Sequence, residues 1–229
     1  KSVTPYNQED SKKKQVTEMF DGISTEYDAL NRKISLGIDV KWRRRVVDLL
    51  IPKKPESILD IATGTGDLAL ALTATKASRI VGLDISAGML SVGKDKVKVE
   101  NLENTIEMVI GDSEALTYDD NSFDAVTVAF GVRNFENLEL GLSELFRVLK
   151  SGGTLVVLET AVPTRFPFKQ GYKFHTQVII PLMGKLFTRD QAAYKYLSDS
   201  AAVFPHGKQF NNILEKMGFI EVEDSPQTL

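Results

Sequence analysis

Small and acidic residues gather where the apolar segment 57–62 ends, and their types suit a site for a charged nucleoside ligand. The chain there reads Ile-Leu-Asp-Ile-Ala-Thr-Gly-Thr-Gly-Asp, with Gly64 and Gly66 on either side of Thr65. A strand that runs into such a loop lets a ligand approach the backbone closely, because glycine has no side chain. Asp60 lies inside the strand, where its carboxylate would repel a pyrophosphate and favour a cationic group. A plain strand-to-helix turn of another α/β protein is the alternative at this point.

A second carboxylate follows the next apolar segment, residues 79–83. Asp84 lies 20 residues after Gly64, and a carboxylate in that place can accept hydrogen bonds from both hydroxyls of a ribose. Proteins that bind NAD use the same device, so Asp84 alone does not distinguish the two ligand classes.

A third carboxylate, Asp112, follows the segment 105–110. It can accept a hydrogen bond from an adenine amino group, while the backbone N–H of Ser113 meets a ring nitrogen. NAD-binding folds have no required counterpart at this place. Each acid taken singly could be a surface residue or a helix cap. Their order at successive strand ends, with Asp60 ahead of the loop, predicts a site for S-adenosylmethionine, whose amino and sulfonium groups are cationic.

Composition narrows the class of protein. The chain has 229 residues, 42% of them hydrophobic and 26% charged, which predicts one soluble globular domain. A net charge of −3 gives no footprint for nucleic acid. Cysteine is absent, so disulfides and thiolate metal sites are excluded, and His175 and His206 are the only imidazoles. We therefore expect no metal. No apolar run approaches the roughly 18 residues of a membrane span, and no signal peptide is visible, so we expect a cytoplasmic protein.

The elements that must position these residues alternate along the chain, which predicts an α/β fold. A mostly parallel, twisted sheet with helices on both faces is expected, because strands and helices take turns. The predicted strands are 57–62, 79–83, 105–110, 123–129, 154–158 and 219–222, and the predicted helices are 41–50, 68–75, 89–99 with Ser86 as its cap, 138–149 and 208–217.

We expect a single domain over residues 1–229, in four parts. Residues 1–50 form an N-terminal helical cover, which begins with a fraying polar arm over residues 1–15 and a short helix from residues 16–20. Residues 51–162 form the donor-binding core. Residues 163–204 contain eight of the nineteen aromatic residues and predict a largely helical insertion, either the lining of an apolar acceptor pocket or plain packing. Residues 205–229 hold the last helix and a sixth strand, and a final C-terminal strand is expected to be missing from the sequence.

Four segments carry motifs of a known family: 27–35 with Trp42, 130–134, 147–155 running to Glu159, and 194–197 with Ser200 and 204–205. By these segments, and from about Val16 onward, the chain resembles the ubiquinone/menaquinone biosynthesis C-methyltransferases, a family of class I methyltransferases with a Rossmann-like fold. Some positions depart from the family's pattern: Ala62 replaces a common loop glycine, Asp39 a frequent histidine, Ser151 a usual proline and Thr160 a usual phenylalanine.

The resemblance implies S-adenosylmethionine as donor, held by Thr65, Asp84, Asp112 and Ser113, and a prenylated hydroquinone as acceptor. The expected reaction converts demethylmenaquinol to menaquinol. A polyprenyl benzoquinol of ubiquinone biosynthesis, or another lipid-like acceptor, is the alternative, and a non-catalytic protein that binds the donor belongs to another class.

Methylation of a ring carbon requires a quinol hydroxyl to lose its proton, so we expect a fixed cation beside the oxygen. Arg133 is the candidate cation, Asn134 could orient the same oxygen, and His175 could take the proton. The alternatives are an ion pair of Arg133 with Glu136 or Asp28, and a packing role for His175.

The partner expected besides the donor is a prenylated naphthoquinol. Such a lipid implies peripheral contact with the inner face of the membrane, through the insertion or through the lysine-rich arm at residues 12–14. A homo-oligomer is left open.

Overall fold

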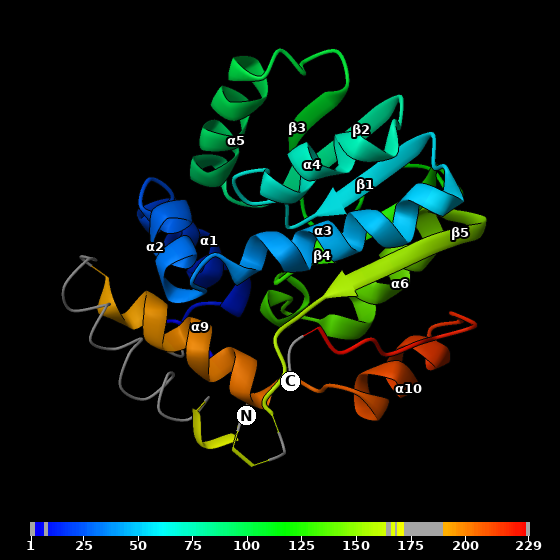
Figure 1. Cartoon of the computed structure of the whole chain (residues 1–229). Coiled ribbons are helices and arrows are strands. Elements are labelled where there is room, and N and C mark those ends of the chain that lie inside the picture. The colour runs from blue at the N-terminus through cyan, green and yellow to red at the C-terminus, as the bar shows by residue number, and fades with distance from the viewer. Residues whose placement is uncertain (1–2, 7–8, 164–165, 168, 172–189, 228–229) are drawn as a thin grey trace.

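The described residues form a five-stranded, wholly parallel sheet. In the computed structural model, which describes residues 3–6, 9–163, 166–167, 169–171 and 190–227, the strand order is β3-β2-β1-β4-β5. Every neighbouring pair runs parallel, which confirms the predicted α/β fold. The order reverses beside β1, the place where open α/β sheets bind ligands. The strands are β1 Ser57–Ile61, β2 Arg79–Asp84, β3 Ile106–Ile110, β4 Phe123–Ala129 and β5 Leu149–Leu158 (Figure 1).

Helices cover both faces of this sheet, and each face has its own apolar core. Helices α3 (Ile38–Leu50), α4 (Asp67–Leu72) and α5 (Ala87–Val99) pack against one face, and α6 (Leu138–Val148) and α10 (Lys208–Lys216) against the other. Short 3₁₀ helices occupy Ile51–Lys53, Thr73–Thr75 and Val132–Asn134. The predicted cap of α5 is confirmed, because the Ser86 hydroxyl accepts a hydrogen bond from Met89 N–H.

The side-chain alternation of the strands explains the two cores. Ile58 of β1 and Ile80 of β2 belong to the core under α3, α4 and α5, whereas their successors Leu59 and Val81 belong to the core under α6 and α10. Successive residues of a strand point to opposite faces, so a strand buried on both faces reads as a continuous apolar run. These are the runs from which the strands were predicted.

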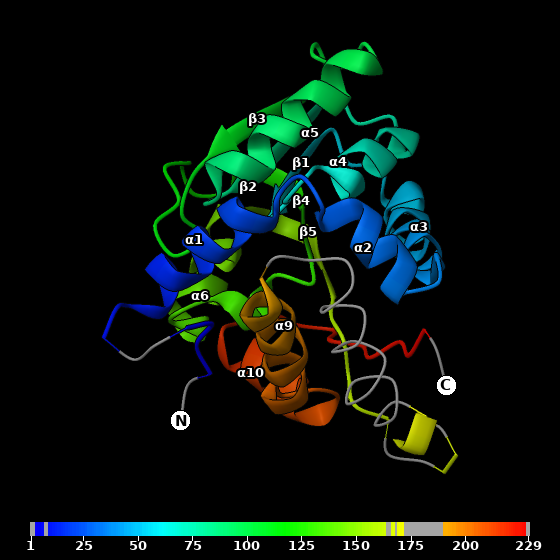
Figure 2. The same ribbon diagram turned by 90° about the vertical axis from the view of Figure 1, so that its left-hand side faces the viewer.

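The N-terminal residues differ from the prediction of a polar arm. They form α1 (Lys12–Ile23) and α2 (Tyr27–Ile34), which pack with α9 (Gln191–Val203) in a third apolar cluster around Met19, Leu30 and Tyr194. In Figure 1 these three helices lie beyond the carboxyl ends of the strands, and Figure 2 looks onto them from that side. The predicted helical cover thus begins at Lys12, and α9 lies in the described part of the predicted insertion.

The predicted sixth strand is wrong. Residues 219–222 have no regular secondary structure. Phe219 instead packs edge-on against Phe146 of α6, with ring centroids 5.1 Å apart, and Val222 joins the same apolar core. A strand needs a neighbour to pair with its backbone groups, whereas this segment is held by its side chains and by the hydrogen bond from Phe219 N–H to the Leu214 carbonyl at 3.2 Å. Among the described helices, none combines the length and the apolar character needed to cross a bilayer.

Candidate active site

The glycine loop between β1 and α4 is shaped by three residues with positive φ. Ala62, Gly64 and Gly66 have φ of 52°, 58° and 80°. A Cβ on Gly66 would lie 3.2 Å from the Met108 side chain, so this glycine allows close packing within the protein. A Cβ on Gly64 would meet nothing within 4 Å. The loop therefore presents bare backbone to open space at Gly64, as a bound nucleoside requires.

Asp84 fixes this loop from the end of β2. Its carboxylate accepts hydrogen bonds from Gly64 N–H and Ser86 N–H, both at 2.8 Å. Burial raises the pKa of Asp84, although these backbone N–H groups oppose the shift. A carboxylate can accept about four hydrogen bonds, so acceptor positions remain for a ligand.

A cavity of about 690 Å³, open to solvent, lies where the carboxyl ends of β1 to β4 meet. Its mixture of apolar walls with a few polar groups is that of a small-molecule site. Five of the predicted site residues line the cavity: Gly64, Asp84, Asp112, Ser113 and Asn134. The wall also includes Tyr27, Ile85 and Phe130.

The end of the cavity at β3 holds a lysine that was not predicted there. Lys13 of α1 pairs with Asp112 at 2.7 Å and with Glu114 at 3.2 Å. Burial would lower the pKa of Lys13, but the two carboxylates outweigh it and raise the pKa. Asp112 also accepts a hydrogen bond from Glu114 N–H at 2.9 Å. Helix α1 therefore closes the cavity beside the position predicted for adenine.

Asp60 lies behind the glycine loop and is 1% exposed. Its two oxygens accept hydrogen bonds from the hydroxyls of Thr63 and Thr127, both at 2.6 Å. Burial raises the pKa of Asp60 to about 6, against these hydrogen bonds. Asp60 borders a smaller space of about 360 Å³, which Gly64 and Thr65 also line. Its charge can act on a ligand over the loop, while its hydrogen bonds hold β1 to β4.

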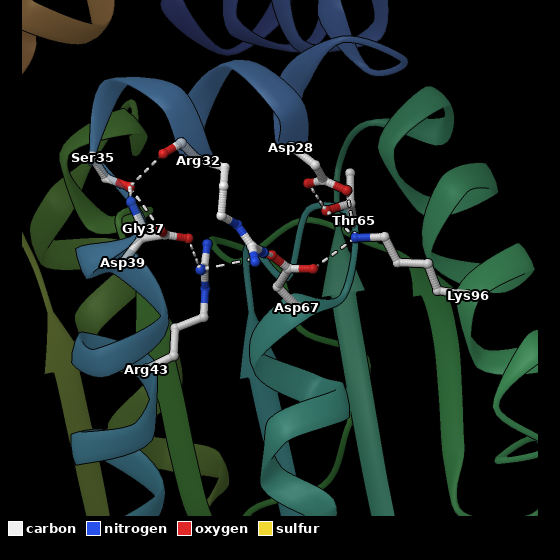
Figure 3. Close-up of polar contacts among 9 residues, drawn as sticks. All are labelled: Asp28, Arg32, Ser35, Gly37, Asp39, Arg43, Thr65, Asp67 and Lys96. Carbon is white, nitrogen blue, oxygen red and sulfur yellow. Dashed lines mark hydrogen bonds and ion pairs between the residues drawn. The ribbon is translucent and has the colours of Figure 1, made fainter.

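Thr65 connects the loop to the N-terminal cover. Its hydroxyl donates to Asp28 of α2 at 2.6 Å, and Lys96 of α5 pairs with Asp28 at 2.5 Å and with Asp67 at 2.7 Å. Figure 3 shows Lys96 reaching across the loop to both carboxylates. Thr65, which was predicted to bind the donor, is 3% exposed and also holds α2 in place.

The same network extends to the turn between α2 and α3. Asp67 pairs with Arg32 at 3.7 Å and with Arg43 at 3.6 Å, and Arg43 pairs with Asp39 at 2.5 Å (Figure 3). Hydrogen bonds from Ser35 and Arg43 lower the pKa of Asp39 despite the opposing effect of burial. Charges from α2, α3 and α5 therefore converge on the start of α4.

Arg133 is buried beside the cavity rather than free at its rim. Its guanidinium pairs with Glu159, which follows β5, and donates to the Phe130 carbonyl at 2.9 Å. The pair involves neither Glu136 nor Asp28, the two acids considered from the sequence. Arg133 Nε and Glu159 Oε2 are buried and have no hydrogen-bond partner among the described residues.

The aromatic residues of α9 mainly pack. Tyr194 and Tyr196 are 1% and 2% exposed and do not line the cavity. The Tyr196 hydroxyl donates to Asn134 Oδ1 at 3.1 Å, so Tyr196 supports a residue that does line it. Tyr172, Phe174 and the predicted proton acceptor His175 lie outside the described residues.

Comparison with known proteins identifies the family. Residues 8–228 match the model of the ubiE/COQ5 methyltransferase family. The chain belongs to this family. Membership implies S-adenosylmethionine as the methyl donor and confirms the resemblance found in the sequence.

Relatives in this family match over nearly their whole length. The chain is 46% identical to the demethylmenaquinone methyltransferase of Bacteroides fragilis, over 96% of this chain and 91% of that protein. It is 42% identical to that of Porphyromonas gingivalis, with 96% and 90% covered. It is 40% identical to the ubiquinone/menaquinone biosynthesis C-methyltransferase of Geobacter sulfurreducens, with 95% and 85% covered.

Solved structures confirm the fold. A putative methyltransferase of Bacillus halodurans is 28% identical with a TM-score of 0.53, over 72% of this chain and 62% of that one. A possible histamine N-methyltransferase of Thermotoga maritima, 20% identical, gives a TM-score of 0.61 over 89% and 81% and supports the fold alone. The class I methyltransferase fold predicted for the chain is therefore confirmed.

Within this family fold, the structure also adds residues that the sequence did not assign to the site. Lys13 was expected in the polar N-terminal arm, Lys96 lies in the predicted helix 89–99 and was given no role, and Glu159 belonged to a motif without a role. The signal that could have found Lys96 is weak, because a lysine in a helix pairs with whatever acid the fold brings near it. Tyr27 and Asp28 stand in a segment that the resemblance had already singled out.

Proposed function

We propose that this protein transfers the methyl group of S-adenosylmethionine to a ring carbon of demethylmenaquinol, giving menaquinol in menaquinone biosynthesis. The observation that carries the proposal is membership of the ubiE/COQ5 family together with the cavity at the strand ends, where Gly64, Asp84 and Asp112 meet. The Bacteroides and Porphyromonas relatives bear the name of this activity.

The cavity fits the donor. The open space over Gly64 admits a nucleoside, Asp84 would accept from the ribose hydroxyls, and Asp112 with Ser113 N–H would meet the adenine. The carboxylate of Asp60 would favour the cationic end of the donor through the loop. When bound, S-adenosylmethionine supplies a methyl group that its sulfonium sulfur makes electrophilic.

The residues on the acceptor side must make a ring carbon nucleophilic. A quinol hydroxyl that loses its proton pushes charge onto the adjacent ring carbon, and such a phenol has an ordinary pKa of about 10. We assign Arg133 to the oxygen because its Nε–H is buried without a partner in the described part of the chain. Asn134 would orient the same oxygen with one amide N–H, because Tyr196 occupies its Oδ1 and its Nδ2 already donates to the Phe130 carbonyl at 3.5 Å. His175 remains the proposed proton acceptor.

A benzoquinol is a second candidate for the methyl acceptor. The Geobacter relative is named for both ubiquinone and menaquinone biosynthesis, so a polyprenyl benzoquinol is the alternative substrate. The residues named above would act in the same way on either ring, since both carry a hydroxyl beside the methylated carbon.

The test uses purified protein, S-adenosylmethionine with a labelled methyl group, and a short-chain demethylmenaquinol or the matching benzoquinol. We expect label in the naphthoquinol ring, detected by mass spectrometry, and about a tenfold or greater loss of donor affinity in Asp84→Asn. Donor binding without methylation of either quinol would overturn the proposal. Label in the benzoquinol alone would favour the alternative. Analysis of quinones in a strain that lacks the protein provides an independent check.

A further inference from the structure

The turn between α2 and α3 exposes the apolar side chain of Leu36 to solvent and holds its backbone in an unfavourable conformation. Leu36 is 85% exposed and has a φ of 53°. A bulky residue is disfavoured at positive φ, where asparagine or glycine would be easier, and an exposed leucine gains nothing from the core. Such departures from local preference concentrate at functional sites.

Two further apolar side chains stand beside Leu36. Ile38 and Val40, in the first turn of α3, are 36% and 46% exposed, while Asp39 between them is 5% exposed and points inward. We call Leu36, Ile38 and Val40 the apolar tip. In Figures 1 and 2, α2 and the start of α3 lie at the carboxyl edge of the sheet, on the side of the candidate active site.

Polar contacts beneath the tip hold it rigid. The Ser35 hydroxyl donates to Asp39 Oδ1 at 2.6 Å, and Gly37 N–H donates to Ser35 Oγ at 3.2 Å. Arg43 pairs with the other oxygen of Asp39 (Figure 3). The tip is therefore preorganised, so binding would not have to order it.

The surroundings of the tip are basic although the protein is acidic. Residues 32–45 contain six lysines and arginines against one acid, the buried Asp39, in a chain whose net charge is −3. Lys41, Arg44 and Arg45 are exposed, and Arg44 has the surface acid Asp48 at 3.1 Å. A protruding group of apolar side chains with basic neighbours matches the interface of a bilayer that carries anionic headgroups.

We propose that the apolar tip docks the protein on an anionic lipid bilayer, with Leu36 and Ile38 entering the interface. A protein partner fits less well, since a stable interface buries about 800 Å² on each side and three convex side chains offer much less. The proposal rests on the proposed function in one respect: a prenylated acceptor resides in a bilayer, and docking at this edge turns the active site toward it.

The structure favours the tip over the lysine-rich arm that the sequence suggested. Lys12 donates to the carbonyls of Arg133 and Phe135 at 2.8 and 2.9 Å, and Lys13 pairs with Asp112. Two of the three lysines at residues 12–14 thus point into the protein.

The test is flotation of the protein with vesicles, without donor or acceptor present. One set of vesicles is phosphatidylcholine, and the other contains equal parts of phosphatidylcholine and phosphatidylglycerol. Leu36→Asn suits the positive φ and should fold normally, and Ile38→Gln removes the second anchor. Val99→Gln is the matched control, because Val99 is 77% exposed at the far end of α5.

We expect the native protein and Val99→Gln to float with the phosphatidylglycerol vesicles and less with phosphatidylcholine alone. The Leu36→Asn/Ile38→Gln variant should partition at least about tenfold less, with an unchanged thermal transition. Equal flotation of native and variant protein would overturn the proposal, as would no flotation of either. A native dimer that the variant converts to monomer, without vesicle binding, would assign the tip to a second copy instead.

An activity assay separates this proposal from the proposed function. With a short-chain acceptor in solution, the variant should retain the native rate, and only turnover of a long-chain acceptor held in vesicles should fall. Loss of vesicle binding with both activities intact would overturn the link between docking and acceptor. If the protein binds vesicles through the tip but methylates neither quinol, the proposed function is refuted while the apolar tip remains the membrane-docking site.

Discussion

The buried pair of Arg133 and Glu159 allows a structural role to be separated from a catalytic one. Their side chains are 7% and 9% exposed. Removing the arginine would leave the carboxylate of Glu159 buried without its cation, and breaking such a pair costs about 3–5 kcal/mol. Arg133→Met is therefore expected to lower the free energy of unfolding by that amount, whatever the arginine does for the reaction. A simple loss of activity in this variant would be ambiguous.

The matched experiment is a double-mutant cycle with Glu159→Gln. In the native protein Thr160 N–H donates to Glu159 Oε1 at 2.8 Å. The side-chain amide introduced by Glu159→Gln would still offer an oxygen to this N–H, but it would carry no charge. Arg133→Met/Glu159→Gln should recover about 2 kcal/mol or more of the stability lost in Arg133→Met, because no unpaired charge remains. Urea unfolding followed by circular dichroism measures all four proteins.

The same four proteins test the catalytic assignment in steady-state methyl transfer to a short-chain acceptor. If Arg133 stabilises the quinol oxygen, kcat falls about a hundredfold in both variants that lack it, even where stability is recovered. A double variant with native kcat would remove Arg133 from the mechanism and leave its pairing with Glu159 as its role. An Arg133→Met protein as stable as the native one would refute the energetic reasoning itself.

Three further outcomes are expected from residues around the glycine loop. Asp84→Asn should weaken donor binding by about tenfold to a hundredfold in calorimetry, with Asp119→Asn on the surface as control; unchanged affinity would place the ribose elsewhere. Burial raises the pKa of Asp60 from 3.8 to about 6, so the folded state holds a proton that the unfolded state has lost between these values. The native stability should therefore fall relative to Asp60→Asn by up to about 3 kcal/mol as pH rises through that window, and parallel pH profiles would contradict this. Lys96→Met should weaken donor binding about fivefold, because α2 loses the ion pair between Lys96 and Asp28. The controls Lys98→Met and Lys96→Arg should bind the donor as the native protein does. Equal effects of Lys96→Met and Lys98→Met would argue against a role for the Lys96–Asp28 pair.

Much of the fold could be predicted because its signals are local. The apolar runs at 57–62 and 79–83 carry the information for buried parallel strands, and the glycines that follow the first run mark the turn. Asp84 and Asp112 were placed correctly at the cavity because a residue at the carboxyl end of a parallel strand has little freedom of position. The class I methyltransferase fold followed from these elements.

The N-terminal cover was predicted to be helical, but the start of α1 at Lys12 was missed although part of its signal was present. Ser11 caps α1 by accepting from Lys14 N–H, and Val16, Met19 and Ile23 have helical spacing. Three consecutive lysines suggested a solvated arm instead. Their partners, the carbonyl of Arg133 and the carboxylate of Asp112, are about a hundred residues away in the chain, and no local pattern reports contacts at that separation.

The sixth strand failed for the opposite reason. Residues 219–222 have a β-like composition, with Phe219, Ile220 and Val222, but composition does not provide a neighbouring strand. Propensity describes a fit to a pleated, paired surface, so without pairing the same residues serve as packing side chains. Ile220 is 83% exposed, which shows that the segment is only partly held.

The ion pairs around Asp67 connect the candidate active site to the apolar tip. Asp67, at the start of α4, pairs with Arg43, whose guanidinium also holds Asp39 beneath the apolar tip. It pairs as well with Lys96, which holds Asp28 next to Tyr27 in the cavity wall. A tip docked on a bilayer would therefore be fixed, through α3, to the loop that faces the donor. Because these pairs are only partly exposed, they are less screened by salt than surface pairs, and the orientation of the tip relative to the loop should persist at physiological ionic strength.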